Sequence, residues 1–384
     1  MKEGFFVSHE IGLYVHIPFC KAKCYYCDFN SYPGLDSLIP EYINALKTEI
    51  EIYAGKLKDK KISTIYIGGG TPSILDGASI DSLLKVIFRN FSVCKDAEIT
   101  IESNPGTLDS SKLHAYHSAG INRLSIGLQS WQDRLLKSIG RIHTANDFIV
   151  NFNEARNAGF MNINIDLMFG LPGQTMEDWM STLQNVISLK PEHISCYSLK
   201  VEEGTPMDKL IQEDESLAIP EELDRMMYHH VVRELKKSGY RHYEISNFAL
   251  SGFESRHNMI YWNACEYLGV GAGSHSYILG ERFGNEESPS EYINKINLKG
   301  SASYSEGIID TMESIKEYMI LGLRLIDGIS PEHFEKRYGI NIYELYGEKI
   351  EELKSRGLLK TEDNRICLTE TGLDLANQVF VEFI

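Results

Sequence analysis

The segment HIPFCKAKCYYCDFN, residues 16–30, constrains the interpretation of the whole chain. It places Cys20, Cys24 and Cys27 in one loop, directly after the apolar run LYVHI, which has the composition of a strand. Cysteines this close together are better suited to binding a metal than to a disulfide framework. Two residues after the third cysteine, where a fourth sulfur could stand, the chain has Phe29. The loop therefore predicts a metal centre for which the chain itself does not supply every ligand.

Around this loop, the first 200 residues alternate short β-branched runs with longer amphipathic ones. Strands separated by helices predict βαβ units, a parallel sheet and right-handed crossovers. We expect an α/β fold, a partial (β/α)6 barrel, with an open doubly wound sheet as the alternative. In either fold the chemistry collects where strands end. The predicted strands begin at Leu13, Ser63, Glu98, Arg123, Asn162 and His193.

The pattern divides the chain into three predicted parts. Residues 1–200 form the barrel core with the cysteine loop, and residues 201–300 extend the barrel. Residues 301–384 read as helices, a hairpin about the turn EDNR and a closing helix, an α+β module that resembles a winged helix. Such modules often bind DNA, but this one has no basic excess, so we expect an interaction or lid domain.

Composition excludes several classes of protein. The chain has 38 Lys and Arg against 54 Asp and Glu, a net charge of −16, which disfavours nucleic acid as a partner. No apolar run reaches the ~20 residues of a membrane span, and the N-terminal segment lacks a signal-peptide core. Closely spaced cysteines favour reduced thiols and the cytoplasm. Oligomeric state stays open, with a homodimer compatible.

Two metals fit the cysteine loop. Zinc sites want four ligands, which His16 or Asp28 could complete, but no matching second cysteine pair follows. A [4Fe-4S] cluster normally takes four cysteines, so three leave one iron open to a small molecule with donor atoms. We favour the cluster and keep zinc as the alternative.

The pattern Cys-x3-Cys-x2-Cys with Tyr26 before the last cysteine resembles the radical S-adenosylmethionine (SAM) superfamily. The resemblance implies a [4Fe-4S] cluster on Cys20, Cys24 and Cys27. It also implies that the amino and carboxylate groups of SAM bind the open iron. An electron from the cluster then splits the sulfonium to a 5′-deoxyadenosyl radical.

Polar residues and glycines at the predicted strand ends could hold such a ligand. Glycines in GGGTP, residues 68–72, let the backbone approach a ligand closely, and Glu102 can accept from hydroxyl or ammonium groups. Arg141 suits a carboxylate. Taken singly, each of these residues is more simply explained as an ordinary residue at a strand end. Because they recur along one edge of the predicted sheet, together they favour a binding site.

The order of these motifs resembles oxygen-independent coproporphyrinogen III oxidase and its relatives over about the first 280 residues. The resemblance implies two sets of SAM contacts. The SAM on the cluster would contact Tyr14, Tyr26, Gly69, Gly70, Thr71 and Glu102. A second SAM would contact Gln129, Arg141 and Asp166.

Two local features favour a sister group, the HemW haem chaperones. The oxidase pattern has an additional cysteine at the position of Phe29, and SRHNMIYW, residues 255–262, matches the HNxxYW signature of that group. The resemblance implies a protein that binds haem and delivers it to haem-accepting proteins, among them membrane-bound respiratory enzymes. Decarboxylation of coproporphyrinogen III propionates is the alternative, and whether the chain is an enzyme stays open. A radical SAM enzyme acting on RNA is disfavoured by the acidic charge.

His257 is the predicted axial ligand of the haem iron, since neutral imidazole binds iron well. Arg256 could pair with a propionate, and Tyr261 and Trp262 could stack on the macrocycle. The alternative is a buried histidine that is hydrogen-bonded to backbone, with Tyr261 and Trp262 packed in the core. Weaker candidates, each more simply structural, are Cys196, Cys265 and His275.

Overall fold

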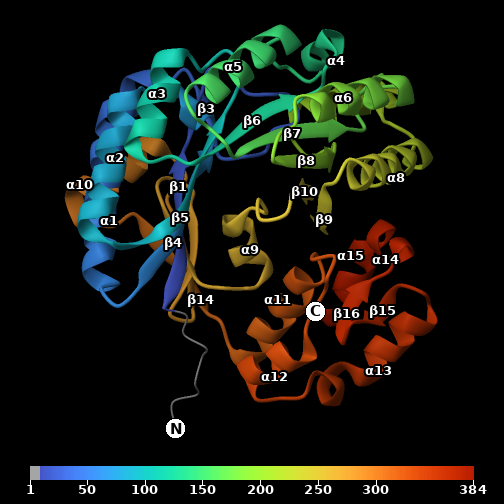
Figure 1. The fold of residues 1–384 in the computed structure, drawn as a ribbon. Coiled ribbons are helices and arrows are strands. Elements are labelled where there is room, and N and C mark those ends of the chain that lie inside the picture. The colour runs from blue at the N-terminus through green and yellow to red at the C-terminus, as the bar shows by residue number, and fades with distance from the viewer. Residues whose placement is uncertain (1–8) are drawn as a thin grey trace.

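The computed structural model describes residues 9–384. Within this range the main sheet contains 12 strands in one curved layer (Figure 1). Its central strands run parallel and neighbour one another in chain order, as the predicted βαβ units require. They are β1 (Glu10–Ile17), β4 (Lys61–Gly69), β5 (Ser92–Ser103), β6 (Arg123–Gln129), β7 (Ile163–Phe169) and β8 (His193–Ser198).

The connecting helices cover the outer, convex face of this sheet, while α9 (Arg256–Trp262) lies on its concave side (Figure 1). A doubly wound sheet would carry crossover helices on both faces, so the barrel interpretation is confirmed. The helices are α1 (Ile39–Lys56), α2 (Gly77–Asn90), α3 (Ser110–Ala119), α4 (Asp133–Ser138), α5 (Ala145–Asn157) and α6 (Met176–Ser188). The strands are nearly continuous apolar runs because both faces are covered; every residue of β6 is buried.

Capping residues fix where two of these helices begin. Thr144 and Asp147 form a capping box at α5, and Thr175 and Asp178 form another at α6. Each box satisfies backbone amides that a helix start leaves without partners. The box at α6 lies in the segment that directly follows β7, whereas α4 separates α5 from the end of β6.

The sheet continues beyond the barrel at both edges. β11 pairs in parallel with β1, and β12 to β14 follow it as antiparallel strands. At the other edge β10 and β9 pair antiparallel next to β8. The elements are α7 (Pro206–Glu213), α8 (Glu221–Lys237), β9 (Arg241–Glu244), β10 (Asn247–Ala249), β11 (Tyr267–Val270), β12 (His275–Ile278), β13 (Glu281–Asn285), α10 (Pro289–Lys299) and β14 (Ser303–Ile308).

The C-terminal region has its own hydrophobic core, which includes Phe334, Leu353 and Ile366. Its hairpin turns at Asp363 and Asn364, whose φ angles of 47° and 58° suit the left-handed turns that join twisted strands. The expected α+β module is confirmed, while the residue boundaries of the three parts stay a prediction. Its elements are α11 (Thr311–Gly322), α12 (Pro331–Tyr338), α13 (Ile342–Ser355), β15 (Leu359–Glu362), β16 (Arg365–Leu368), α14 (Glu370–Asp374) and α15 (Ala376–Phe380).

Two expectations concern membranes and export. Among the described residues, no helix combines the length and apolarity needed to cross a bilayer. The segment expected to lack a signal peptide begins with residues 1–8, which lie outside the described residues.

Candidate functional site

The cysteine loop leaves β1 and is held in place by backbone hydrogen bonds. The amide of Tyr25 donates to the carbonyl of Ile139 at 3.0 Å, and the amide of Met207 donates to the carbonyl of Tyr25 at 2.9 Å. Cys20 is buried, whereas Cys24 and Cys27 are partly exposed. The loop is thus anchored to the barrel while two of its cysteines stay partly exposed.

Polar side chains that follow β4, β5 and α4 connect two of the cysteines. The Thr71 hydroxyl lies 3.4 Å from Cys20 Sγ, and Asn104 Nδ2 donates to that hydroxyl at 2.9 Å. Arg141 donates to Asn104 Oδ1 at 2.7 Å and lies 3.5 Å from Cys24 Sγ. The structure therefore brings the predicted Thr71 and Arg141 together with the loop through Asn104, which the sequence analysis did not single out.

Gly70 lies so close to the loop that no larger residue fits. A Cβ at this position would meet the Phe19 carbonyl oxygen at 2.7 Å and Cys20 Sγ at 2.9 Å. The glycine of GGGTP is therefore needed for close approach to the loop rather than for an unusual backbone conformation.

Substitution of Gly70 tests this packing. Gly70→Ala should lower the free energy of unfolding by about 1–3 kcal/mol, because overpacking forces backbone or sulfur to move. Gly55→Ala is the matched control: nothing lies within 4 Å of a Cβ there, in α1. That change should raise stability by roughly 0.5–1 kcal/mol. Urea unfolding of both variants measures the difference, and equal effects would contradict the close approach.

A second cluster surrounds Glu102 at the end of β5. Tyr66 donates to Glu102 Oε1 at 2.7 Å, and the amide of Gly69 donates to Oε2 at 3.1 Å. The ring of Tyr14 stacks on that of Tyr66 with centroids 6.2 Å apart. Burial raises the pKa of Glu102 to about 7, although the Tyr66 hydrogen bond opposes this. The predicted Tyr14, Gly69 and Glu102 therefore lie together, and Glu102 is poised to change charge near neutral pH.

Gln129 and Arg141 carry buried polar atoms without partners. Gln129 Oε1 and Arg141 Nε have no hydrogen bond, and Gln129 has a φ of 69°, uncommon outside glycine. A Cβ on Gly127 would meet side-chain atoms of Gln129, Asn104 and Arg141, each at 3.0 Å. Unsatisfied buried groups that converge on one point are a feature of ligand sites. This crowding is compatible with the predicted second SAM contacts.

Asp166 and Tyr26 already interact with neighbouring polar or charged side chains. Both oxygens of Asp166 accept hydrogen bonds, from Ser125 and Asn164, at 2.8 Å each. Burial raises the pKa of Tyr26, while the positive charge of Arg141 opposes the shift. A ligand at Asp166 would therefore have to replace existing partners.

The donor set is suited to the predicted cluster, although its thiols are not preassembled. Within residues 9–384, no three His, Cys, Asp or Glu side chains are gathered as a metal site. The three loop thiols, the close approach at Gly70 and the orphaned atoms of Gln129 and Arg141 fit a cluster with an additional polar ligand.

His257 on α9 is buried, and both of its ring nitrogens are occupied. Nδ1 lies 2.7 Å from the Thr64 hydroxyl and Nε2 lies 2.9 Å from the Tyr261 hydroxyl. Burial lowers the pKa of His257 to about 3, and its ring stacks on Tyr66 at 5.1 Å. The geometry resembles the alternative of a packed histidine, except that its partners are side chains rather than backbone.

The chain matches known families along most of its length. Residues 14–186 match the Radical SAM superfamily, and residues 309–375 match the HemN C-terminal domain. Heme chaperone HemW of Bacillus subtilis is 40% identical over 97% of this chain and 98% of its own length. The chain belongs to the HemW family. Heme chaperone HemW of Lactococcus lactis is 38% identical over 97% and 96% of the two chains.

Outside the HemW family, the fold is also that of a solved relative. The structure of coproporphyrinogen III oxidase (HemN) from Escherichia coli superposes with a TM-score of 0.84 at 26% identity, over 97% of this chain and 90% of that one. Phe29, where the oxidase pattern has an additional cysteine, is 64% exposed.

Two residues of the site were missed by the sequence analysis of this HemW-family chain. Asn104 and Tyr66 connect the predicted residues by hydrogen bonds. A signal existed for both: Asn104 directly follows β5 in ESNP, and Tyr66 points to the same face of β4 as Gly68.

Proposed function

We propose that this chain is a haem chaperone that binds haem and delivers it to haem-accepting proteins, membrane-bound respiratory enzymes among them. The observation that carries the proposal is the 40% identity to Heme chaperone HemW of Bacillus subtilis, which extends over 97% of the chain. The cytoplasm is the proposed compartment. The net charge of −16 supports a function without nucleic acid, and a homodimer remains compatible.

A [4Fe-4S] cluster and SAM are the proposed cofactors, with Cys20, Cys24 and Cys27 as cluster ligands. When bound and reduced, the cluster would supply the electron for cleavage of the SAM sulfonium. The proposed SAM contacts on the cluster side are Tyr14, Tyr26, Gly69, Gly70, Thr71 and Glu102. The proposed contacts for a second SAM are Gln129, Arg141 and Asp166.

The residues of the chain have distinct proposed tasks in holding these groups. Gly70 keeps the backbone close to Cys20, and Glu102 offers a carboxylate whose charge depends on pH near 7. Arg141 places a positive charge 3.5 Å from Cys24 Sγ.

A second candidate function is oxidative decarboxylation of coproporphyrinogen III. The TM-score of 0.84 to the Escherichia coli oxidase favours it, whereas Phe29 at the position of the additional cysteine disfavours it. Fold alone does not decide between a carrier and a catalyst.

Haem titration separates the two functions. Anaerobically reconstituted protein should give a saturable Soret change with haem, and no protoporphyrinogen with coproporphyrinogen, SAM and reductant. Formation of protoporphyrinogen together with 5′-deoxyadenosine would favour the oxidase. Absence of saturable haem binding would refute the chaperone proposal.

A further inference from the structure

A cavity of about 470 Å³ lies between the β11–β13 edge of the sheet and α11. Its size is in the range of small-molecule and cofactor sites, roughly 300–1,000 Å³. It adjoins α9, since Tyr261 of the HNxxYW signature forms part of its wall. The residues that matter for its chemistry are Tyr261, Cys265, Tyr267, His275, Tyr277 and Arg282.

Aromatic rings dominate the walls of this cavity. Tyr267 and Tyr277 stand directly opposite each other on β11 and β12, so their side chains share one face of the sheet. The ring of Tyr261 meets that of Tyr267 edge-on, with centroids 4.7 Å apart. Three tyrosine rings around one space suit a large, flat, apolar ligand with polar edges.

His275 lines the same cavity with a nitrogen available for a metal. Its Nδ1 lies 2.8 Å from Glu306 Oε1, and the side chain is 51% exposed. Among the described residues, no hydrogen bond to Nε2 is found. A carboxylate beside one ring nitrogen orients the imidazole so that the other nitrogen can face a metal, as in metal-ligating histidines. His257, by contrast, has both nitrogens occupied.

Arg282 supplies a cation at the cavity wall. Its guanidinium donates to Glu317 at 2.7 and 3.0 Å and lies 5.8 Å from the centroid of Tyr277. A ligand carboxylate could share this donor group, which presents several N–H bonds in one plane. The cavity therefore joins an aromatic wall, a free imidazole nitrogen and a cation.

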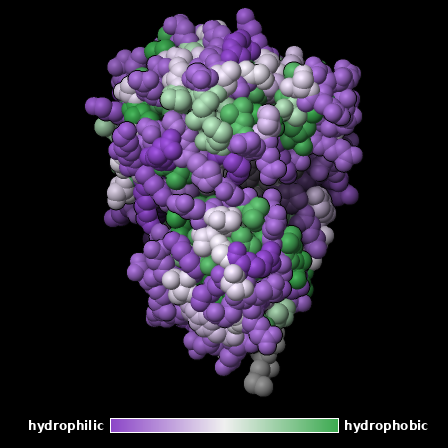
Figure 2. Space-filling model, turned by 90° about the vertical axis from the view of Figure 1, so that its right-hand side faces the viewer, coloured by the Kyte–Doolittle hydropathy of each residue, from purple (hydrophilic) through white to green (hydrophobic). Residues whose placement is uncertain are grey.

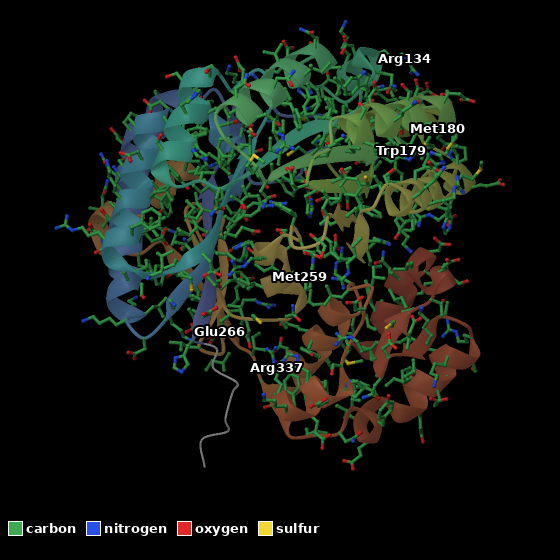
Figure 3. The ribbon with its side chains drawn as sticks, viewed as in Figure 1. Arg134, Trp179, Met180, Met259, Glu266 and Arg337 are labelled. Atoms are coloured by element: carbon green, nitrogen blue, oxygen red, sulfur yellow. The ribbon has the colours of Figure 1, made fainter. Side chains whose placement is uncertain are left out.

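Hydrogen bonds connect one side of the cavity to the C-terminal module. Arg337 of α12 donates to the carbonyl of Asn263 at 2.8 Å and also to that of Ala264, which lines the cavity. Figure 3 labels Arg337, Glu266 and Met259 around this connection between α9 and β11. The cavity is thus formed jointly by the barrel extension and the C-terminal module.

We propose that this cavity is the haem site of the chain and that His275 Nε2 is an axial ligand of the haem iron. The proposal rests on the proposed haem-chaperone function and names its site. His257 then acts as a positioning residue, because its hydrogen bond to the Tyr261 hydroxyl fixes one wall of the cavity.

A rival groove of about 670 Å³ lies along α8. Figure 2 shows apolar side chains on this face. Met226, which lines the groove, is exposed, and so is Met180, which is labelled in Figure 3. The side chain of His229 in this groove is 46% exposed. Its Nε2 lies 3.0 Å from Asp374 Oδ2, so Nδ1 is the nitrogen left to bind a metal. Nδ1 adjoins the residue's own backbone, which would crowd a porphyrin, so the groove fits haem less well.

Haem titration of four proteins tests the site: wild type, His275→Ala, Glu306→Gln and the matched control His229→Ala. Each is titrated with haem as the full, anaerobically reconstituted chain, after circular dichroism confirms folding. We expect His275→Ala to weaken haem binding at least tenfold and free imidazole to restore the wild-type Soret spectrum. Glu306→Gln should weaken binding roughly tenfold, and His229→Ala should match wild type.

The outcomes separate the site from the function. If wild type binds haem and His275→Ala binds it equally well, the site is refuted while the chaperone proposal stands. Loss of binding in His229→Ala alone would place haem in the rival groove. If wild type shows no saturable binding, the chaperone function and this site fail together.

Discussion

Cys24→Ala should abolish the iron–sulfur cluster. A [4Fe-4S] cluster takes four ligands, and the loop offers only Cys20, Cys24 and Cys27, so loss of one leaves too few protein donors. Iron per chain and visible charge-transfer absorbance should fall to background after anaerobic reconstitution. The variant should remain folded, because Cys24 is partly exposed and its thiol contacts polar side chains, Arg141 and Tyr26.

Cys94→Ala is the matched control for this experiment. Cys94 is 7% exposed on β5 and packs outside the loop, so its removal should leave iron content unchanged. A Cys24→Ala protein that keeps full iron and colour would contradict the assignment. Colourless wild-type protein that contains zinc after anaerobic purification would favour the alternative metal.

The parallel strands of the barrel were predictable because their sequence signal is local. Runs such as RLSIGLQ are buried on both faces and stand between amphipathic segments, which is a pattern that periodicity detects. The hairpin at Asp363 and Asn364 was also predictable, because residues that tolerate positive φ mark such turns. The same strand assignment also predicted which residues lie at the strand ends and face the site.

The long-range contacts were not predictable in this way. Thr64 and His257 are 193 residues apart in the sequence. Only the folded structure shows that the Thr64 hydroxyl and His257 Nδ1 are hydrogen-bonded to each other. Glu98 of β5 likewise accepts from the amides of Arg256 and His257 and so fixes the start of α9 inside the barrel. The sequence signature HNxxYW suggests a ligand, whereas the contacts determine which nitrogen atoms are free to bind one.

Glu102→Gln should weaken SAM binding in a pH-dependent manner. Burial raises the pKa of Glu102 to about 7, so the carboxyl is about 10% ionised at pH 6 and about 90% at pH 8. The neutral amide of the variant mimics the protonated carboxyl. The ratio of SAM affinities, wild type over variant, should therefore rise about tenfold between pH 6 and pH 8. Titration of SAM itself cancels in this ratio, and the exposed Glu41→Gln should show no such change.

The pH dependence of the free energy of unfolding tests the pKa of the same carboxyl without any ligand. Because the pKa of Glu102 is raised on folding from 4.5 to about 7, the folded chain binds this proton more tightly than the unfolded chain. The contribution of the protonated form is complete below pH 4.5 and is lost as the pH rises through about 7. The loss is on the order of 1–3 kcal/mol. Urea unfolding should show that Glu102→Gln removes this decline, and parallel curves for the two proteins would mean that folding does not raise the pKa of Glu102.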